Sequence, residues 1–153
     1  MNLLLDTCVL IDYVGKREPF YSDAKKIVAA GYFGDANLWT PGPSFKDAFY
    51  VLQHYADPRS IQQAFVKVAD VILPTALLAE DYVRAARLEW PDYEDCLVAL
   101  AAEQVRADYL ITRDAKGFER SSVPVLSPAA WIAMMEEEHN LAFDIIDATE
   151  GDR

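Results

Sequence analysis

Four aspartate residues stand where predicted strands end or predicted helices begin. Asp6 follows the apolar run at residues 3–5, Asp47 and Asp95 lie near the starts of two predicted helices, and Asp114 follows the run "YLIT". In a parallel sheet, the carboxyl ends of the strands and the amino ends of the following helices share one edge, so all four carboxylates can converge there. Carboxylates that crowd together need a compensating cation, and oxygen-only ligands favour Mg²⁺ or Mn²⁺ over zinc. The four aspartates therefore predict a divalent-metal site.

Taken singly, each of these aspartates also has a structural interpretation. Asp6 could cap the helix that follows it, and Asp114 could be an ordinary turn residue. Asp47 and Asp95 end the tetrapeptides "SFKD" and "DYED", which resemble a capping box, in which an acid in the first turn bonds back to the helix cap. What favours a metal site is the placement of all four on one edge, reached from four separate segments.

The elements that must position these side chains alternate along the chain. Short apolar runs without alternation predict buried strands, and apolar residues at helical spacing predict helices. Strands are predicted at residues 3–5, 37–40, 70–74, 108–114 and 123–128, and helices at residues 8–14, 22–33, 43–56, 60–69, 75–90, 92–107 and 129–135. This alternation predicts βαβ units. We therefore expect an α/β fold, a three-layer α/β/α sandwich around a central, mostly parallel sheet of four or five short strands.

The composition indicates one globular domain followed by an acidic segment. The chain has 153 residues, of which 52% are hydrophobic, and a formal net charge of −11. Near Glu136 the composition changes, which divides a domain at residues 1–135 from an acidic tail at residues 136–153. The tail has seven acids against one base, a net of −6, so the excess of acids in the domain is modest. The net charge therefore does not exclude a nucleic-acid partner.

The acidic tail also carries four large apolar residues. They are Leu141, Phe143, Ile145 and Ile146. Such a segment is either a flexible, solubilising end or an apolar strip that docks on the domain or on a partner chain. We expect docking, because four large apolar residues are unusual for a purely solvating tail.

Other features limit the classes of site and location. No stretch is apolar over the roughly 18 residues that cross a bilayer, and the N-terminus lacks the features of a signal peptide, so no membrane contact and a cytoplasmic location are expected. Cys8 and Cys96 lie beside apolar neighbours in predicted helices, and we interpret them as core residues without a disulfide. His54 and His139 have no ligand spacing with these cysteines, so a zinc site is not expected.

Five segments follow one another in an order that can be matched to a known family. They are "LLLDTCVLID", "SFKDAFYVL", "DYEDCLVALAA", "YLITRDAKGF" and "VPVLSP". Together they resemble the PIN domain family, a nuclease fold used by many toxins of the VapC type, over about residues 2–135. The resemblance implies a PIN-like fold and metal-dependent hydrolysis of RNA. It also implies, for a toxin, a cognate antitoxin as a protein partner, and a homodimer is possible.

The resemblance also implies roles for individual residues. In the family, acids at the positions matched by Asp6, Asp47, Asp95 and Asp114 bind Mg²⁺ or Mn²⁺, and Thr7 matches a Thr or Ser that assists. In this scheme Asp6 and Asp95 are the primary ligands and Asp47 is a further ligand or orients the attacking water. Asp114 completes the site or holds a second ion.

Basic residues near the same edge are the candidates for contacts with RNA phosphates. They are Lys46, Arg113 and Lys116. Lys46 and Arg113 adjoin proposed ligands, so the alternative for both is charge balance on a solvated rim.

The sequence departs from the family pattern at one of the four acids. The family usually has Glu where this chain has Asp47, whose side chain is shorter by one methylene. This leaves open the alternative of a degenerate PIN-like module that binds RNA or a protein partner without cutting. Asp92 and Glu94 flank Asp95, and we interpret them as solvated acids of a helix start, with contacts to a second metal as the alternative.

Overall fold

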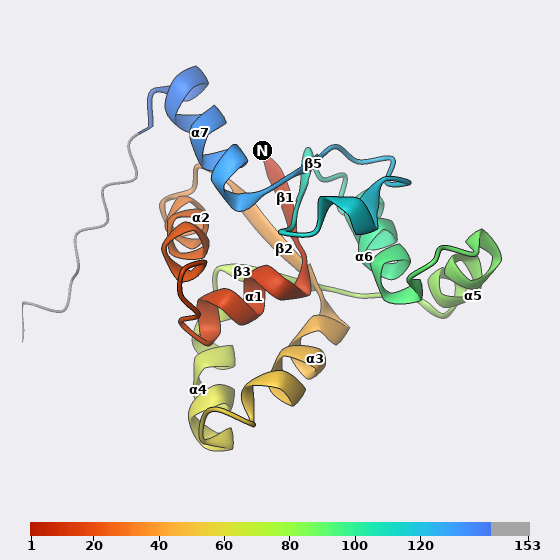
Figure 1. The fold of residues 1–153 in the computed structure, drawn as a ribbon, viewed down its shortest axis with the longest axis horizontal. Coiled ribbons are helices and arrows are strands. Elements are labelled where there is room, and N and C mark those ends of the chain that lie inside the picture. The colour runs from red at the N-terminus through yellow and green to blue at the C-terminus, as the bar shows by residue number, and fades with distance from the viewer. Residues whose placement is uncertain (142–153) are drawn as a thin grey trace, which may run out of the picture.

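A five-stranded sheet forms the centre of the protein. The computed structural model describes residues 1–141, and within them lie five strands and seven α-helices (Figure 1). The strands are β1 (Asn2–Leu5), β2 (Asn37–Pro41), β3 (Ile72–Thr75), β4 (Tyr109–Ile111) and β5 (Val125–Leu126). Their order in the sheet is β3-β2-β1-β4-β5, and every neighbouring pair is parallel. The predicted parallel α/β architecture is thus confirmed.

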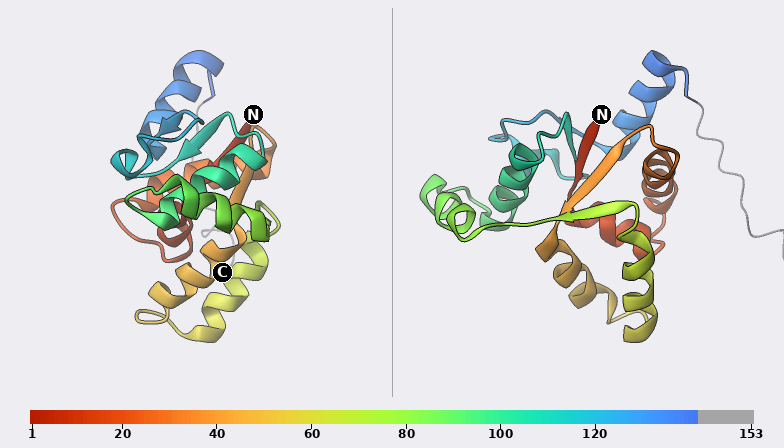
Figure 2. Two further views of the ribbon diagram at one scale, coloured as in Figure 1. Left: turned by 90° about the vertical axis from the view of Figure 1, so that its right-hand side faces the viewer. Right: turned by 180° about the vertical axis from the view of Figure 1, so that it is seen from behind.

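The helices cover both faces of this sheet. They are α1 (Thr7–Val14), α2 (Tyr21–Phe33), α3 (Gly42–Leu52), α4 (Pro58–Val68), α5 (Ala79–Leu88), α6 (Tyr93–Gln104) and α7 (Pro128–His139). Figures 1 and 2 show α5 and α6 on one side of the sheet and α1, α2, α4 and α7 on the other. α3 continues from β2 beyond the sheet edge and packs against α1 and α4.

The central strand contributes to the packing on both faces. Leu3 and Leu5 of β1 are fully buried in a cluster with side chains of α1, α2 and α7. Leu4 is fully buried in a second cluster with side chains of α6. Because successive side chains of a strand point to opposite faces, three leucines in a row suit a strand that is covered on both sides. This explains why "LLL" forms the middle of the sheet.

Several element boundaries differ from the predicted ones. β3 continues through Pro74 to Thr75, although we expected Pro74 to end it. Because β3 is an edge strand, proline can lie there without removing a ladder hydrogen bond. A 3₁₀ helix that the sequence pattern did not predict, η1 (Ala115–Phe118), follows Asp114. The last helix runs to His139, past the change in composition at Glu136.

Three expectations concern the cysteines, the apolar residues near the C-terminus and membrane spans. Cys96 is fully buried and Cys8 partly buried, and both are free thiols. Leu141 packs against the larger core cluster, whereas Phe143, Ile145 and Ile146 lie outside the described residues. Among the helices of residues 1–141, none has the length and apolar character that a membrane span requires.

Candidate active site

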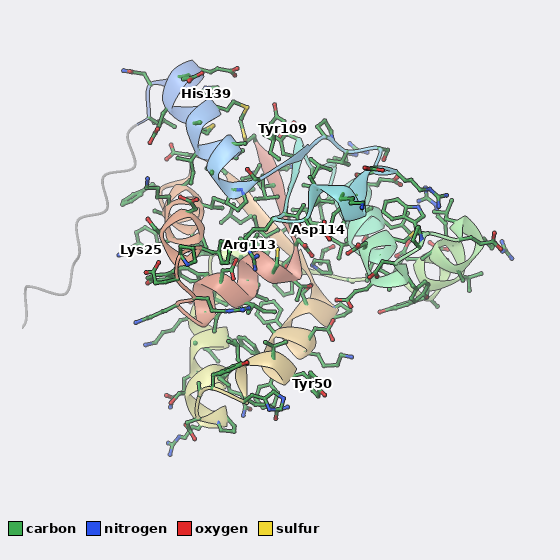
Figure 3. All side chains as sticks on the ribbon, in the orientation of Figure 1. Lys25, Tyr50, Tyr109, Arg113, Asp114 and His139 are labelled. Atoms are coloured by element: carbon green, nitrogen blue, oxygen red, sulfur yellow. The ribbon has the colours of Figure 1, made fainter. Side chains whose placement is uncertain are left out.

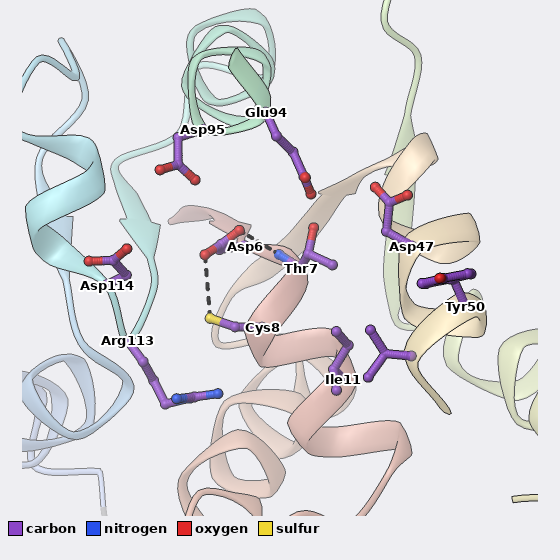
Figure 4. Close-up of a pocket in the computed structure, with 11 residues that line it drawn as sticks. Asp6, Thr7, Cys8, Ile11, Asp47, Tyr50, Glu94, Asp95, Arg113 and Asp114 are labelled. Atoms are coloured by element: carbon purple, nitrogen blue, oxygen red, sulfur yellow. Dashed lines mark hydrogen bonds between the residues drawn. The ribbon is translucent and has the colours of Figure 1, made fainter. Parts of the chain in front are cut away.

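The four predicted aspartates line one cavity at the carboxyl edge of the sheet. Asp6 directly follows β1, Asp114 follows β4, and Asp47 and Asp95 project from α3 and α6. The cavity has a volume of about 510 Å³, and Glu94 also lines it. Figure 4 shows the five carboxylates arranged around it. The structure therefore brings together side chains that are as much as 108 positions apart in the sequence, from Asp6 to Asp114.

Asp6 is the most buried of these acids. It is the N-cap of α1, and its Oδ1 accepts a hydrogen bond from the backbone N–H of Thr7 at 2.7 Å. Its Oδ2 accepts from the Thr112 hydroxyl at 2.7 Å and from the Cys8 thiol at 3.3 Å. Burial raises the pKa of Asp6, and the negative charge of Asp114 adds to the rise, although the three hydrogen bonds oppose it. The capping role and the place in the cavity thus coexist in one side chain.

Thr112 is a site residue that the sequence analysis missed. Its fully buried hydroxyl donates to Asp6 and accepts the backbone N–H of Asp114 at 3.0 Å. It therefore ties the acid after β1 to the segment that carries the acid after β4. The available signal was a polar residue at the end of an apolar run, in "YLIT".

Thr7 connects the first helix with the helix that carries Asp47. The hydroxyl of Thr7 lies 2.8 Å from that of Ser44, and both residues are buried. Burial raises the pKa of the neighbouring Cys8 thiol to about 12, with Asp6 as the next cause, so this thiol stays neutral and can donate to Asp6. Thr7 thus lies beside the acids, in the place expected for an assisting residue, and fixes how α1 meets α3.

Asp95 lies in the first turn of α6. Asp92 is the N-cap, and its Oδ1 accepts the backbone N–H groups of Glu94 and Asp95 at 2.9 and 3.2 Å. Asp92 thus supplies the helix cap. Burial raises the pKa of Asp95 to about 6, and the negative charges of Asp92, Asp6, Asp114 and Glu94 add to the rise.

Gly117 leaves room for two of these carboxylates. A Cβ atom at this position would lie 2.4 Å from Oδ2 of Asp95 and 3.1 Å from Oδ2 of Asp114. The backbone N–H of Gly117 donates to Oδ1 of Asp114 at 3.3 Å. The absence of a side chain at residue 117 therefore lets both carboxylates lie against the backbone of this residue.

The capping interpretation of Asp47 is wrong. α3 begins at Gly42, with Pro41 as its N-cap, so Ser44 is already inside the helix and Asp47 lies in the second turn. The helix starts early because Pro43 suits its first turn. The Asp47 carboxylate instead lies 3.3 Å from Nζ of Lys46 and faces the cavity (Figure 4).

Glu94 is the second site residue that the sequence analysis undervalued. We interpret it as a solvated acid, and its side chain is exposed. It nevertheless lines the cavity, and Figure 4 shows its carboxylate pointing toward the space that Asp47 also faces. Burial raises the pKa of Glu94, and the charges of Asp47, Asp92 and Asp6 add to the rise. Its position directly before Asp95, at the start of a helix whose amino end meets the cavity, was the available signal.

Arg113 lines the same cavity, but its guanidinium is bound within the protein. Nε donates to Oδ2 of the buried Asp12 at 2.6 Å, and an Nη donates to Oδ1 at 3.2 Å. The guanidinium carbon lies 3.9 Å from the ring centroid of Phe20. Figure 3 shows Arg113 beside α1, near Asp114. These contacts anchor the segment between β4 and η1, and they engage the charge that was expected to meet RNA.

The other two predicted basic residues lie at the edges of the acidic cavity. Lys46 is exposed and pairs with Asp47. Lys116 lines a second cavity of about 410 Å³, which shares Asp95 and Asp114 with the first. Arg120 also lines this second cavity, and its guanidinium donates to the carbonyl oxygens of residues 88 and 89.

The donor set suits a hard divalent cation. All five acids offer oxygen ligands. Burial, and after it the repulsion between neighbouring acids, raises the pKa of Asp6, Asp95 and Glu94, and a bound cation would oppose this rise. Within residues 1–141, no three acidic, histidine or cysteine side chains already lie close enough together to hold a metal ion. Binding therefore requires the carboxylates to turn toward a common point.

The sequence matches the family model described as "PIN domain" over residues 2–116. The chain therefore belongs to the PIN domain family. No curated protein sequence matches it.

Solved structures with the same fold have little sequence similarity to this chain. The VapBC-1 structure from nontypeable Haemophilus influenzae has a TM-score of 0.62 at 18% identity, over 84% of this chain and 99% of the other. The VapBC2 structure from Rickettsia felis, bound to a promoter DNA fragment, has 0.61 at 15%, over 83% and 98%. The FitAcB structure from Neisseria gonorrhoeae has 0.58 at 18%, over 83% and 98%. At these identities the likeness establishes the fold.

Proposed function

We propose that this protein is a Mg²⁺- or Mn²⁺-dependent endoribonuclease that acts in the cytoplasm as the toxin of a toxin–antitoxin pair. The observation that carries the proposal is the cavity in which five carboxylates, from the segments after β1 and β4 and from α3 and α6, meet in a PIN domain. Such a set of oxygen ligands is the arrangement that phosphodiester hydrolysis by metal-activated water requires.

The proposed mechanism assigns a task to each part of the cavity. Asp6 and Asp95 would hold the primary cation, and Asp114 would complete the site or hold a second ion. When bound, the cation would lower the pKa of a water molecule and neutralise the charge that develops on the phosphate. Asp47 orients the attacking water. Glu94, whose pKa is raised, is suited to accept the proton that this water loses.

The residues around the acids serve as their support. Thr112 holds Asp6 and the backbone of Asp114 in register through its hydroxyl. Thr7 and Ser44 fix the helix that carries Asp47 against α1. Because these hydroxyl groups are buried, they fix Asp6 and the segments that carry the other acids, so that only side chains need to turn when a cation binds.

The test is cleavage of a mixed RNA pool by purified protein with Mg²⁺, with Mn²⁺ or with EDTA. Wild type should cleave with metal only, and Asp6→Asn and Asp95→Asn should lose the activity. Asp70→Asn is the matched control, because Asp70 is exposed and precedes β3 at the opposite edge of the sheet. Equal cleavage by wild type, Asp6→Asn and Asp95→Asn would reveal a contaminating nuclease and refute the proposal.

The partner part of the proposal rests on the solved structures of similar fold. The similar structures are those of VapBC-1 and VapBC2, and we propose by analogy that this chain binds a cognate antitoxin. We further propose that it forms a homodimer. Co-purification with the product of an adjacent small gene, and the mass of the purified chain in solution, test the two statements separately.

A second candidate function is a PIN-like module that binds RNA or a protein without cutting. It is favoured by the short side chain of Asp47 and by the finding that the acids of residues 1–141 are not assembled around one point. The same assay separates the two candidates. RNA binding by wild type without cleavage in either metal would support the second.

A further inference from the structure

The cavity that holds the acids also has an apolar wall. Ile11, Tyr50 and Val51 line it together with the carboxylates. Figure 4 shows Ile11 and Tyr50 on one side, below Asp47, and Asp95 and Asp114 on the other. Figure 3 places Tyr50 on the outer surface of α3. One end of the cavity is thus suited to a charged group and the other to a flat apolar one.

The ring of Tyr50 remains accessible at this wall. Tyr50 is 67% exposed and lies three residues after Asp47 on α3, so both side chains project from the same face of the helix. Its ring is nearly perpendicular to that of His54, at an interplanar angle of 89° and a centroid separation of 5.7 Å. An aromatic ring that is open to solvent next to a polar site is well placed to contact a ligand.

The charges of the cavity show what kind of contact is needed there. Its five carboxylates repel phosphates, the guanidinium of Arg113 is engaged by Asp12, and Lys46 pairs with Asp47. Contacts that do not depend on charge are therefore suited to add to the affinity of a nucleic acid at this cavity. Stacking of a base on an aromatic ring is such a contact, and each stacked base contributes about 5- to 150-fold in affinity.

We propose that Tyr50 stacks against an unpaired base of the RNA, next to the acids that would hold the cation. This inference rests on the proposed function and adds a substrate-binding residue to it. The base lies along the wall formed by Ile11, Tyr50 and Val51. From there the RNA strand passes over the acids toward the second cavity, which shares Asp95 and Asp114 with the first. A base that is paired in a duplex cannot reach the ring, so the site selects unpaired nucleotides.

The experiment compares three variants on an RNA oligonucleotide that wild type cleaves at one position. Tyr50→Ala should raise KM about 5- to 150-fold with a smaller change in kcat, because stacking contributes to substrate binding before the chemical step. Tyr50→Phe should recover most of this loss, since it keeps the ring. Tyr55→Ala is the matched control, because Tyr55 is an exposed aromatic residue (84%) of the same segment that does not line the cavity.

A substrate series identifies the stacked base. Each oligonucleotide of the series lacks one base near the cleavage site. For one of them, wild type should bind the strand more weakly than the intact strand, whereas Tyr50→Ala should bind both strands equally well. If wild type and Tyr50→Ala lose affinity for this substrate by the same factor, stacking is refuted. A KM of Tyr50→Ala equal to that of wild type would also refute it.

Two other results have distinct meanings. If wild type cleaves no RNA, the proposed function fails, and the inference fails with it. If Tyr50→Ala cleaves normally but loses an antitoxin, the ring is a partner contact, and the inference fails while the proposed function stands.

Discussion

Replacement of Gly117 by alanine should separate the activity of this protein from its stability. The added Cβ would lie 2.4 Å from Oδ2 of Asp95, whereas ordinary contacts begin at 3.4 Å, so the carboxylate must move by about 1 Å. The atom that must move is the end of a side chain, and an off-rotamer turn costs about 0.5–1.5 kcal/mol. The free energy of unfolding should therefore fall by no more than about that amount.

The effect of Gly117→Ala on catalysis should be much larger. A displacement of about 1 Å in a catalytic group costs about 100-fold in rate. Asp95 moves directly, and Asp114 is also crowded, because its Oδ2 would lie 3.1 Å from the new carbon. We expect a loss of cleavage of about 100-fold or more, at a folded fraction that matches wild type.

The assay for Gly117→Ala combines chemical denaturation in metal-free buffer with initial cleavage rates across a range of Mn²⁺ concentrations. Asp70→Asn serves as the control for handling and purity. If Gly117→Ala cleaves at the wild-type rate, the position of the Asp95 carboxylate does not matter for catalysis, and the reasoning is refuted. If the variant unfolds, the energetic argument is wrong.

Three further changes test other parts of the cavity. The pKa of Asp95 is raised to about 6, so in metal-free buffer the folded state holds a proton that the unfolded state releases. The stability of the protein should therefore fall as the pH rises through that value. Thermal unfolding of Asp95→Asn should lack this part of the pH dependence. At pH 7, Asp95→Asn should be as stable as wild type or more stable. Asp47→Gln should stay folded but lose most of its cleavage activity and part of its stabilisation by Mn²⁺. Asp47→Glu should keep or increase the activity. Normal cleavage kinetics in Asp47→Gln would show that Asp47 is not part of the site. Thr112→Val should reduce the free energy of unfolding by about 1.5–3 kcal/mol in denaturant titrations, since it removes a buried hydrogen bond to a charged group and the acceptor of the Asp114 backbone N–H. An unchanged midpoint would contradict this.

The sequence was sufficient to predict the sheet and the four aspartates because both depend on local patterns. An apolar run that ends in an acid shows where a strand ends, and parallel strands bring their ends to one edge. The start of α3 was harder to predict, because Pro41, Gly42 and Pro43 all suit a turn as well as a first helical turn. The error moved Asp47 from the second turn into the first and made a cap plausible.

The remaining features depend on contacts between distant segments. The hydroxyl of Thr112 meets Asp6 only after β4 pairs with β1, and the guanidinium of Arg113 meets Asp12 by the same pairing. Glu94 was undervalued because an acid in the first turn of a helix is usually solvated. None of these contacts has a signature in the spacing of neighbouring residues, so composition and periodicity cannot show them.

The pairing of the first and fourth strands has a consequence for when the protein can become active during its synthesis. The hydrogen bond between Asp6 and Thr112 joins residues 106 positions apart, and four of the five acids of the cavity come from later segments than β1. A ribosome that has released only the first half of the chain has therefore produced no complete cavity. Because contacts between distant residues form late in folding, the capacity to cleave arises only when β4 is released and paired. If this protein cleaves RNA as we propose, the order of its strands delays that activity until β4 has left the ribosome.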